Sequence, residues 1–288
     1  MMSSDRRVHQ MIAQGEIFLA AGVYDALSAK LAERAGFHAV VVTGYGVSAS
    51  TLGEPDFGLM TQTELIDAAR RICNAVSIPV SVDGDTGYGG ALNVFRLVEA
   101  LKEMGARGVL LEDQVWPKRC GHMRGKDVIP AGEHEQKIRA AVEARGDYAL
   151  MITARTDALA THGLDEAIRR ANLYKQAGAD LIFVEAPRTV EDLREIARQV
   201  PPPLVINCIE GGQTPLLPLE QLKELGFIAV GYVLSGLYAA AKALSDVYAC
   251  LLEHGTSQPM RDRMMDFNEF AEVIGLSEKY ALDERFRG

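Results

Sequence analysis

Residues 112–126 read Glu-Asp-Gln-Val-Trp-Pro-Lys-Arg-Cys-Gly-His-Met-Arg-Gly-Lys and place one cysteine among three potential cations. Lys118, Arg119 and His122 flank Cys120 in a short loop that follows an apolar run. Because nearby positive charge stabilises a thiolate, this spacing predicts a lowered pKa for Cys120. We expect these four residues to take part in proton transfer or nucleophilic attack. The alternative is a small residue in an ordinary surface loop.

Carboxylates stand where several apolar runs end. Asp83 and Asp85 follow one run, and Glu112 ends the next. Carboxylates are disfavoured beside buried strands unless they are paired or bind a metal. An all-oxygen cluster suits Mg²⁺, or Mn²⁺, so the sequence predicts a divalent metal site. Helix capping or turn formation in the glycine-rich loop 84–90 is the alternative for the two aspartates.

Other strand ends carry groups that could hold an anionic substrate. Arg155 is a candidate carboxylate clamp, with an ion pair to Asp157 or Glu185 as the structural alternative. The backbone N–H groups of residues 43–45 could stabilise an oxyanion, unless they form only a glycine turn. The loop 210–215 could bind a second carboxylate.

Short apolar runs alternate eight times with amphipathic segments, which favours a (β/α)8 barrel. The alternative is an open sheet of six or seven strands with one misassigned segment. The expected strands are 17–21, 39–43, 79–83, 108–112, 149–154, 181–185, 204–208 and 229–233. The expected helices are 25–36, 62–75, 91–104, 133–145, 165–177, 189–199, 218–225 and 236–254.

The chain is predicted to be a single domain over residues 1–288, with 255–288 as a C-terminal helical extension. Phe267, Phe270, Tyr280 and Leu282 recur there at roughly helical spacing outside the eight units. Such an apolar segment needs a surface to cover, on its own barrel or on a neighbouring subunit.

Composition narrows the class of protein. The 288 residues are 48% hydrophobic and carry a net charge of −9, which argues against nucleic-acid and anionic-membrane partners. No apolar run reaches the roughly 18 residues of a transmembrane helix, and the N-terminus has no apolar signal core. The four cysteines lack metal-knuckle spacing, so we expect reduced thiols and a cytoplasmic location.

Three motifs together resemble the isocitrate lyase/phosphoenolpyruvate mutase superfamily. They are Asp-Gly-Asp-Thr-Gly-Tyr-Gly at 83–89, Leu-Glu-Asp-Gln at 111–114 and Lys-Arg-Cys-Gly-His at 118–122. The resemblance runs roughly from Gly22 to the C-terminus, and the last motif marks the lyase side of the family. Residues 43–45, 116–117, 183–188 and 210–212 look most like the group of petal death protein, 2,3-dimethylmalate lyase and methylisocitrate lyase.

The resemblance implies a Mg²⁺-dependent lyase that splits a 2-hydroxy di- or tricarboxylate into a 2-oxo acid and a carboxylate. It also implies a last helix exchanged between subunits, in a homo-oligomer that we expect to be a tetramer of helix-swapped dimers. Residue roles follow from the same resemblance. Asp85 would bind the metal most directly, with Asp83, Asp56 and Glu112 acting largely through water. The 2-oxo-acid half of the substrate would be held by Thr43, Gly44, Tyr45 and Arg155, and the departing half would face Asn207, Glu185 and Thr214; Gly121, His122 and Asp83 would also contact substrate. Cys120 would be the general acid, with Tyr45 beside it in catalysis.

The sequence departs from the family pattern at Gly84, Cys208 and Val233, where alanine, methionine and proline are commoner. The change at Val233 leaves the substrate open. A carboxyphosphonoenolpyruvate-type phosphonomutase, or an oxaloacetate hydrolase or decarboxylase, remains an alternative on the same barrel. A barrel that has lost catalysis is a further alternative, against which the intact set of candidate site residues argues.

Overall fold

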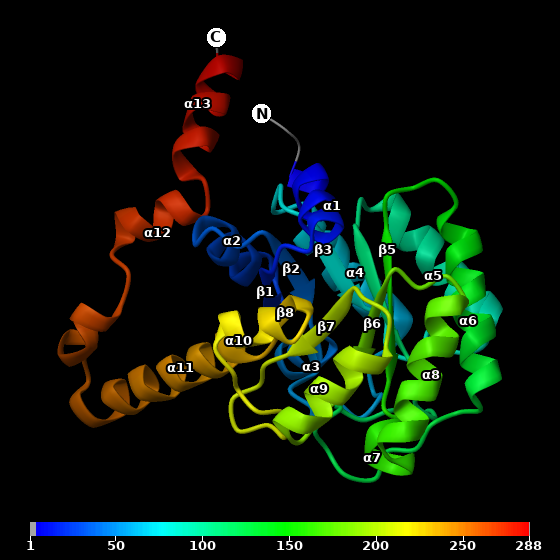
Figure 1. Ribbon diagram of the computed structural model, residues 1–288. Helices are drawn as coiled ribbons and strands as arrows, with labels where there is room; N and C mark the ends of the chain where they lie inside the picture. Colours follow the sequence, from blue (N-terminus) through cyan, green and yellow to red (C-terminus); the bar gives the residue numbers. More distant parts are fainter. Residues whose placement is uncertain (1–3, 288) are drawn as a thin grey trace.

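The computed structural model, which describes residues 4–287, is a closed barrel of eight parallel strands (Figure 1). Neighbouring strands follow the chain order, and β1 closes the ring by pairing with β8. The strands are β1 Phe18–Val23, β2 Ala39–Val42, β3 Val80–Asp83, β4 Gly108–Glu112, β5 Met151–Thr156, β6 Leu181–Val184, β7 Leu204–Asn207 and β8 Phe227–Tyr232. The barrel and all eight predicted strands are confirmed, with bounds that differ by two residues at most.

Helices alternate with these strands and cover the outside of the barrel. The predicted helices correspond to α2 Ala26–Arg34, α4 Gln62–Cys73, α5 Ala91–Glu103, α6 Ala131–Arg145, α8 Leu164–Gln176, α9 Val190–Gln199, α10 Leu219–Glu224 and α11 Ser235–His254. Local signals explain several starts. Thr61 and Glu64 form a capping box on α4, and Thr189 and Asp192 form one on α9.

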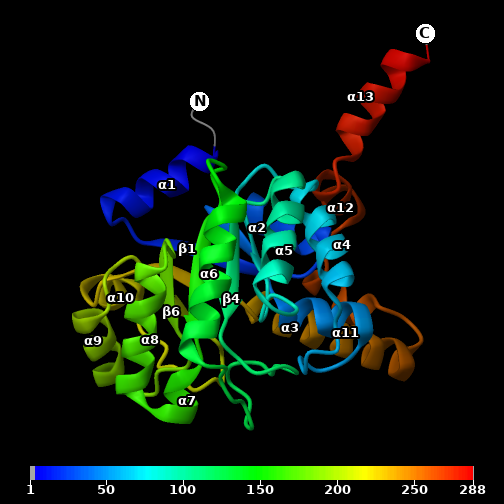
Figure 2. The same cartoon turned by 90° about the vertical axis from the view of Figure 1, so that its right-hand side faces the viewer.

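The sequence analysis did not anticipate several shorter or terminal elements. They are α1 Ser4–Gln14, α3 Gly44–Val47, the π-helix η1 Ser48–Leu52, α7 Ala158–His162 and the 3-10 helix η2 Gln258–Arg263. Helix α1 packs Val8, Met11 and Ile12 against Phe18 and Ala229 of the strands. Figures 1 and 2 show α1 at one end of the barrel and α3 and α7 at the other. With α1 over the N-terminal end, an accessible site belongs at the end where the strands finish.

The register of the strands sets which end groups become neighbours. Glu112 pairs with Arg155 across β4 and β5, and Asp83 lies opposite Leu110 on β4. Because parallel strands end at one edge, the carboxylate and the guanidinium reach the same mouth of the barrel. Strand order alone therefore assembles much of the predicted site.

The C-terminal part of the chain leaves the barrel. Helix α11 projects to one side, followed by α12 Phe267–Val273 and α13 Leu276–Phe286 (Figure 1). It leaves apolar side chains in solvent, with Leu252 90% exposed and Phe267 83% exposed. Within residues 4–287, no helix is both long and apolar enough to cross a membrane.

Candidate active site

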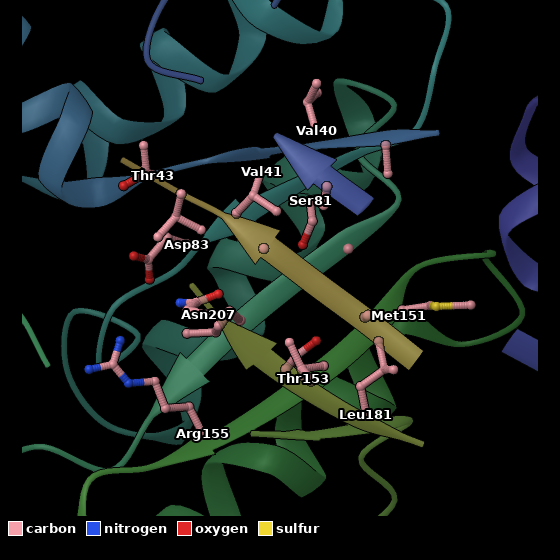
Figure 3. Close-up of a pocket in the computed structure, with 18 of the residues that line it drawn as sticks. Val40, Val41, Thr43, Ser81, Asp83, Met151, Thr153, Arg155, Leu181 and Asn207 are labelled. Atoms are coloured by element: carbon pink, nitrogen blue, oxygen red, sulfur yellow. The ribbon is translucent and has the colours of Figure 1, made fainter. Parts of the chain in front are cut away.

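A cavity of about 140 Å³ lies inside the barrel and opens among the strand ends. Figure 3 shows Thr43, Asp83, Arg155 and Asn207 gathered at one end of this pocket, with Met151 and Leu181 toward the other. Nine predicted site residues line it: Thr43, Tyr45, Asp56, Asp83, Cys120, Gly121, Arg155, Glu185 and Asn207.

The segment between β4 and α6, residues 114–128, forms a folded loop that brings Cys120 to this cavity. An antiparallel bridge between Gln114 and Val128 closes its base. The Gln114 side chain then bonds the Arg119 backbone at both ends, donating to its carbonyl at 2.8 Å and accepting from its N–H at 3.0 Å. The Cys120 N–H donates to the Asp56 carbonyl at 3.1 Å. We call residues 114–128 the cysteine loop.

Gly121 makes the closest approach of the cysteine loop to the barrel. A Cβ atom at this position would lie 2.3 Å from Glu185 Oε1 and 2.5 Å from Arg155 Nη2. No L side chain fits there without a shift, so glycine permits the loop to close directly on the charged strand ends.

The Lys118 ammonium binds two carboxylates and not the thiol. Its Nζ lies 2.8 Å from Asp56 Oδ2 and 2.6 Å from Asp85 Oδ1, and all three side chains are buried. Burial alone would lower the pKa of Lys118, but Asp85, Glu112 and the neighbouring carboxylates hold it well above its ordinary value. Lys118 is therefore a fixed cation of the cysteine loop, bound to the carboxylates beside the cavity.

Arg119 is not brought into the site. Its Nη1 donates to the Arg124 carbonyl at 2.8 Å, and its guanidinium lies 5.2 Å from the centre of the Phe57 ring. The side chain braces the outside of the cysteine loop. Arg119 does not line the cavity, and its catalytic role stays a prediction.

The predicted low pKa of Cys120 is also wrong. Burial raises the pKa of the thiol to about 11, and the charges of Asp56 and Glu185 add to that effect. The neighbouring cations in sequence are committed elsewhere, Lys118 to Asp56 and Asp85 and His122 to Glu185. The thiol is protonated at neutral pH, which suits a proton donor and not a ready nucleophile.

The Arg155 guanidinium contacts three carboxylates at or just after the ends of the strands. It forms two parallel bonds to Asp157, from Nε at 2.9 Å and from Nη2 at 3.0 Å. Its Nη1 lies 3.3 Å from Glu112 Oε2, and its Nε lies 3.4 Å from Glu185 Oε2. Arg155 therefore forms the ion pairs with Asp157 and Glu185 that were the alternative to a substrate clamp. These carboxylates hold its guanidinium rigidly in the position from which it could bind a substrate.

His122 joins the cysteine loop to the segment after β7. Its Nδ1 accepts from the Gln213 N–H at 2.9 Å, so the neutral ring carries its proton on Nε2. That Nε2 lies 3.1 Å from Glu185 Oε1. Burial would raise the pKa of Glu185, but Arg155 and His122 hold it below its ordinary value. Thr214 is buried next to Gln213 and does not line the cavity.

The residues after β2 also contribute backbone groups. Thr43 caps the short helix α3, and the Gly44 N–H donates to Asp83 Oδ2 at 3.4 Å. Asp83 Oδ1 accepts from the Asp85 N–H at 3.2 Å, which is the turn-forming role offered as an alternative. Both oxygens of Asp83 are therefore engaged by the backbone.

Asp83, Asp85 and Glu112 do not form the preassembled carboxylate cluster that the sequence predicted. Among residues 4–287, no three His, Cys, Asp or Glu side chains come together as a metal site. The reason is Lys118, whose ammonium lies against Asp85, together with the backbone bonds that engage Asp83.

The remaining oxygens nevertheless fit a hard divalent cation. Within the described chain, neither carboxylate oxygen of Glu112 accepts a hydrogen bond, although both are buried. Burial raises the pKa of Glu112 well above its ordinary value, and burial together with Asp85 raises the pKa of Asp83. The buried Glu112 carboxylate, whose oxygens accept no hydrogen bond, matches a cation that keeps several waters and takes few direct protein ligands.

A second charged network, beneath the first, was not assigned a role from sequence. Asp113 accepts from Thr156 Oγ1 and Tyr174 Oη at 2.8 Å, from the Asp157 N–H at 2.9 Å and from Arg170 Nη1 at 3.0 Å. It thereby ties the end of β4 to the end of β5. The signal in the sequence was the acidic pair after β4, whose second member faces away from the cavity.

The wall of the cavity near β8 is apolar. Ile209, Val233 and Leu234 form a small buried cluster, with Tyr45 packed against it. The Val233 departure from the family pattern falls within this wall.

Sequence comparison gives independent information on ancestry. Residues 8–252 match the family model of phosphoenolpyruvate phosphomutase. The chain is 52% identical over 281 residues to the petal death protein of Dianthus caryophyllus, covering 97% of this chain and 88% of that protein. It is 47% identical to the chloroplastic carboxyvinyl-carboxyphosphonate phosphorylmutase of Arabidopsis thaliana (97% and 84% covered). It is 42% identical to the 2,3-dimethylmalate lyase of Eubacterium barkeri (96% of each chain).

Solved structures of other enzymes are similar to this chain over nearly its whole length. Oxaloacetate acetylhydrolase in complex with 3,3-difluorooxalacetate superposes with a TM-score of 0.93 at 34% identity, over 99% of this chain and 98% of that one. Phosphonopyruvate hydrolase in complex with oxalate and Mg²⁺ superposes with a TM-score of 0.89 at 28% identity, over the full length of both. Together with the barrel and the cysteine loop, these matches show that the chain is an enzyme of the isocitrate lyase/phosphoenolpyruvate mutase superfamily.

Proposed function

We propose that the protein is a Mg²⁺-dependent carbon–carbon lyase that cleaves a 2-hydroxy dicarboxylate into a 2-oxo acid and a carboxylate. The observation that carries this proposal is the Cys120 thiol, which the cysteine loop holds at a cavity lined by strand-end carboxylates and Arg155. Close relatives named as 2,3-dimethylmalate lyase and 2-methylisocitrate lyase support the same reaction class.

Asp85 and Glu112 are the residues that would hold the cation, with Asp83 and Asp56 acting through water. When bound, Mg²⁺ would supply positive charge that favours an ionised hydroxyl and an enolate oxygen. Lys118 and Arg155 add fixed positive charge in the same dry pocket, where electrostatic interactions are strong.

The reaction needs one proton removed and one delivered. The substrate hydroxyl gives its proton to a carboxylate at the strand ends, for which Asp83 lines the cavity, the C2–C3 bond breaks as the C2 carbonyl forms, and the bonding electrons pass to the departing half as an enolate. Cys120 then donates its thiol proton to that carbon. Among the proposed catalytic residues, Tyr45 carries the second exchangeable proton, on its phenol, and it lines the cavity beside Leu234.

The apolar wall favours an alkyl substituent on the departing half. Ile209, Val233 and Leu234 would contact an alkyl substituent more favourably than a third carboxylate. We therefore place 2-alkylmalates, including 2,3-dimethylmalate, ahead of the tricarboxylate 2-methylisocitrate.

A phosphonomutase or an oxaloacetate hydrolase is the second candidate. The 47% identical phosphorylmutase and the oxaloacetate acetylhydrolase structure favour keeping it. Both reactions would use the same cavity and the same cation.

Helix exchange is part of the proposal. The second half of α11 leaves Leu244, Tyr248, Leu251 and Leu252 exposed, and Phe267 of α12 is exposed as well. A second subunit that receives α11 would bury them, in a tetramer of swapped dimers with one barrel domain per chain. Light scattering should give the mass of a tetramer, and a monomer would contradict this arrangement.

The deciding experiment is a screen for 2-oxo-acid release in the presence of Mg²⁺, with products identified by NMR. The panel holds several 2-alkylmalates, 2,3-dimethylmalate, 2-methylisocitrate, isocitrate and oxaloacetate. Cys120→Ser should lower cleavage by about two to four orders of magnitude and leave substrate binding intact. Cys73, a half-buried cysteine in α4, gives the matched control, and Cys73→Ser should keep wild-type activity.

If no hydroxy acid is cleaved while oxaloacetate or phosphonopyruvate is turned over, the second candidate is the function of the protein. Wild-type cleavage by Cys120→Ser would remove the thiol from the mechanism.

A further inference from the structure

We propose that Lys126 is a positioning residue that locks the closed cysteine loop to Arg155 through Asp157. The inference concerns the site of the proposed function, but its physical claim is about loop closure and requires no particular substrate. Neither the sequence motifs nor the comparisons give Lys126 a role.

Lys126 bonds both the loop and the barrel. Its Nζ donates to the Gly121 carbonyl, within the cysteine loop, and to Asp157 Oδ1 at 2.8 Å, just beyond β5. The Lys126 side chain is only 3% exposed, and that of Asp157 is fully buried. One ammonium thus joins the residue next to Cys120 to the end of a strand.

Asp157 passes this constraint to the substrate clamp. The carboxylate that accepts from Lys126 also receives both bonds from Arg155, at 2.9 and 3.0 Å. Its backbone N–H is fixed in turn by Asp113 at 2.9 Å. Asp157 therefore has a rigid position, and Lys126 and Arg155 share its two oxygens.

This arrangement makes closure and clamp orientation depend on each other. When the cysteine loop is closed, Lys126 satisfies Asp157 Oδ1 and shares the charge that orients Arg155. When the loop opens, Lys126 must leave, and Arg155 becomes the only charged partner retained by Asp157 among the described residues. Loss of a buried charged donor leaves its acceptor unsatisfied, so removal of the ammonium should favour the open loop.

The test measures opening directly. Cys120 lies next to Gly121 in the loop, so its alkylation by iodoacetamide, followed by peptide mass spectrometry, reports how often the loop opens. We expect Lys126→Met to raise the alkylation rate of Cys120 at least tenfold at fixed pH. Lys126→Arg, which keeps the charge and the donors, should return the rate toward wild type. Lys223→Met, an exposed lysine on α10, should leave it unchanged.

A merely structural role predicts a different result. Lys126→Met would then lower the melting temperature without changing the alkylation rate of Cys120 in the folded protein, and that outcome would overturn the proposal. Should Lys126→Met fold poorly, Lys126→Gln keeps an N–H donor without the charge and gives the same test.

Kinetics on whichever substrate the enzyme accepts adds a second readout. Because Arg155 holds the substrate, Lys126→Met should raise KM as well as lower kcat, whereas Cys120→Ser should lower kcat alone. If the lyase activity itself is absent, the alkylation test still decides the role of Lys126, so the two proposals fail separately.

Discussion

Gly121→Ala tests whether the closed cysteine loop is the working form of the site. Gly121 has no unusual backbone angle, so alanine is resisted only by space. The added methyl would lie 2.3 Å from Glu185 Oε1 and 2.5 Å from Arg155 Nη2. To reach ordinary contact distance, the loop must retreat by about 1 Å.

A displacement of about 1 Å from the productive geometry can lower the rate by about a hundredfold. We therefore expect Gly121→Ala to lower kcat for 2-oxo-acid release by about two orders of magnitude. The melting temperature should change little, because the loop can move outward without opening the core. Gly132→Ala, in the first turn of α6, has nothing within 4 Å of the added methyl and should be neutral.

Wild-type kcat in Gly121→Ala, with an unchanged Cys120 alkylation rate, would refute this reasoning. It would mean that Glu185 and Arg155 yield to the methyl, and that the close approach of the loop has no catalytic value.

Two further predictions concern the metal and acid stability. EDTA should abolish turnover and added Mg²⁺ should restore it in the wild type but not in Asp85→Ala, whereas full activity in EDTA would exclude the oxygen-ligand site. Burial, helped by Lys137 and Arg170, lowers the pKa of His134 to about 3, so the folded protein keeps this ring neutral while the unfolded chain protonates it near pH 6.5. Stability should therefore fall as the pH drops from 6.5 toward 3, by about 2 kcal/mol between pH 7 and pH 5 from His134 alone. Denaturant titrations should show that His134→Gln loses this part of the acid sensitivity, and an identical pH slope in the two proteins would contradict the assignment.

The barrel could be predicted from sequence because its signal is repetitive and local. Each strand lies in a short, largely apolar run, and several helices begin at a capping box. Helix α1 was missed because it precedes the first repeated unit and has a short apolar face, with Val8, Met11 and Ile12 packed against the barrel. The exposure of α11 could not be predicted, because a period shows which face is apolar and not what covers it.

The membership of the site was largely predictable, and the direction of its charges was not. Strand order and register bring Glu112 and Arg155 together, as expected from their positions in the sequence. The partners of Lys118 and Arg119 depend on how the cysteine loop folds, and residue spacing carries no information on that. Lys126 gave no sequence signal at all, since one lysine near the end of a loop resembles any solvated charge.

The fate of the cations also argues for the kind of chemistry that Cys120 performs. A sequence rich in positive charge suggested a thiolate, yet each of the three basic neighbours contacts something else: Lys118 two carboxylates, Arg119 the Arg124 carbonyl, and the His122 ring Glu185. Burial then raises the pKa of the thiol to about 11. A nucleophile would need the opposite arrangement, with an unpaired cation beside the sulfur. A group that must donate a proton to carbon needs to hold that proton until the enolate forms, and a neutral thiol meets this requirement. The charge distribution thus favours Cys120 as an acid in cleavage, and it makes the loop cations part of the scaffold that keeps the thiol neutral.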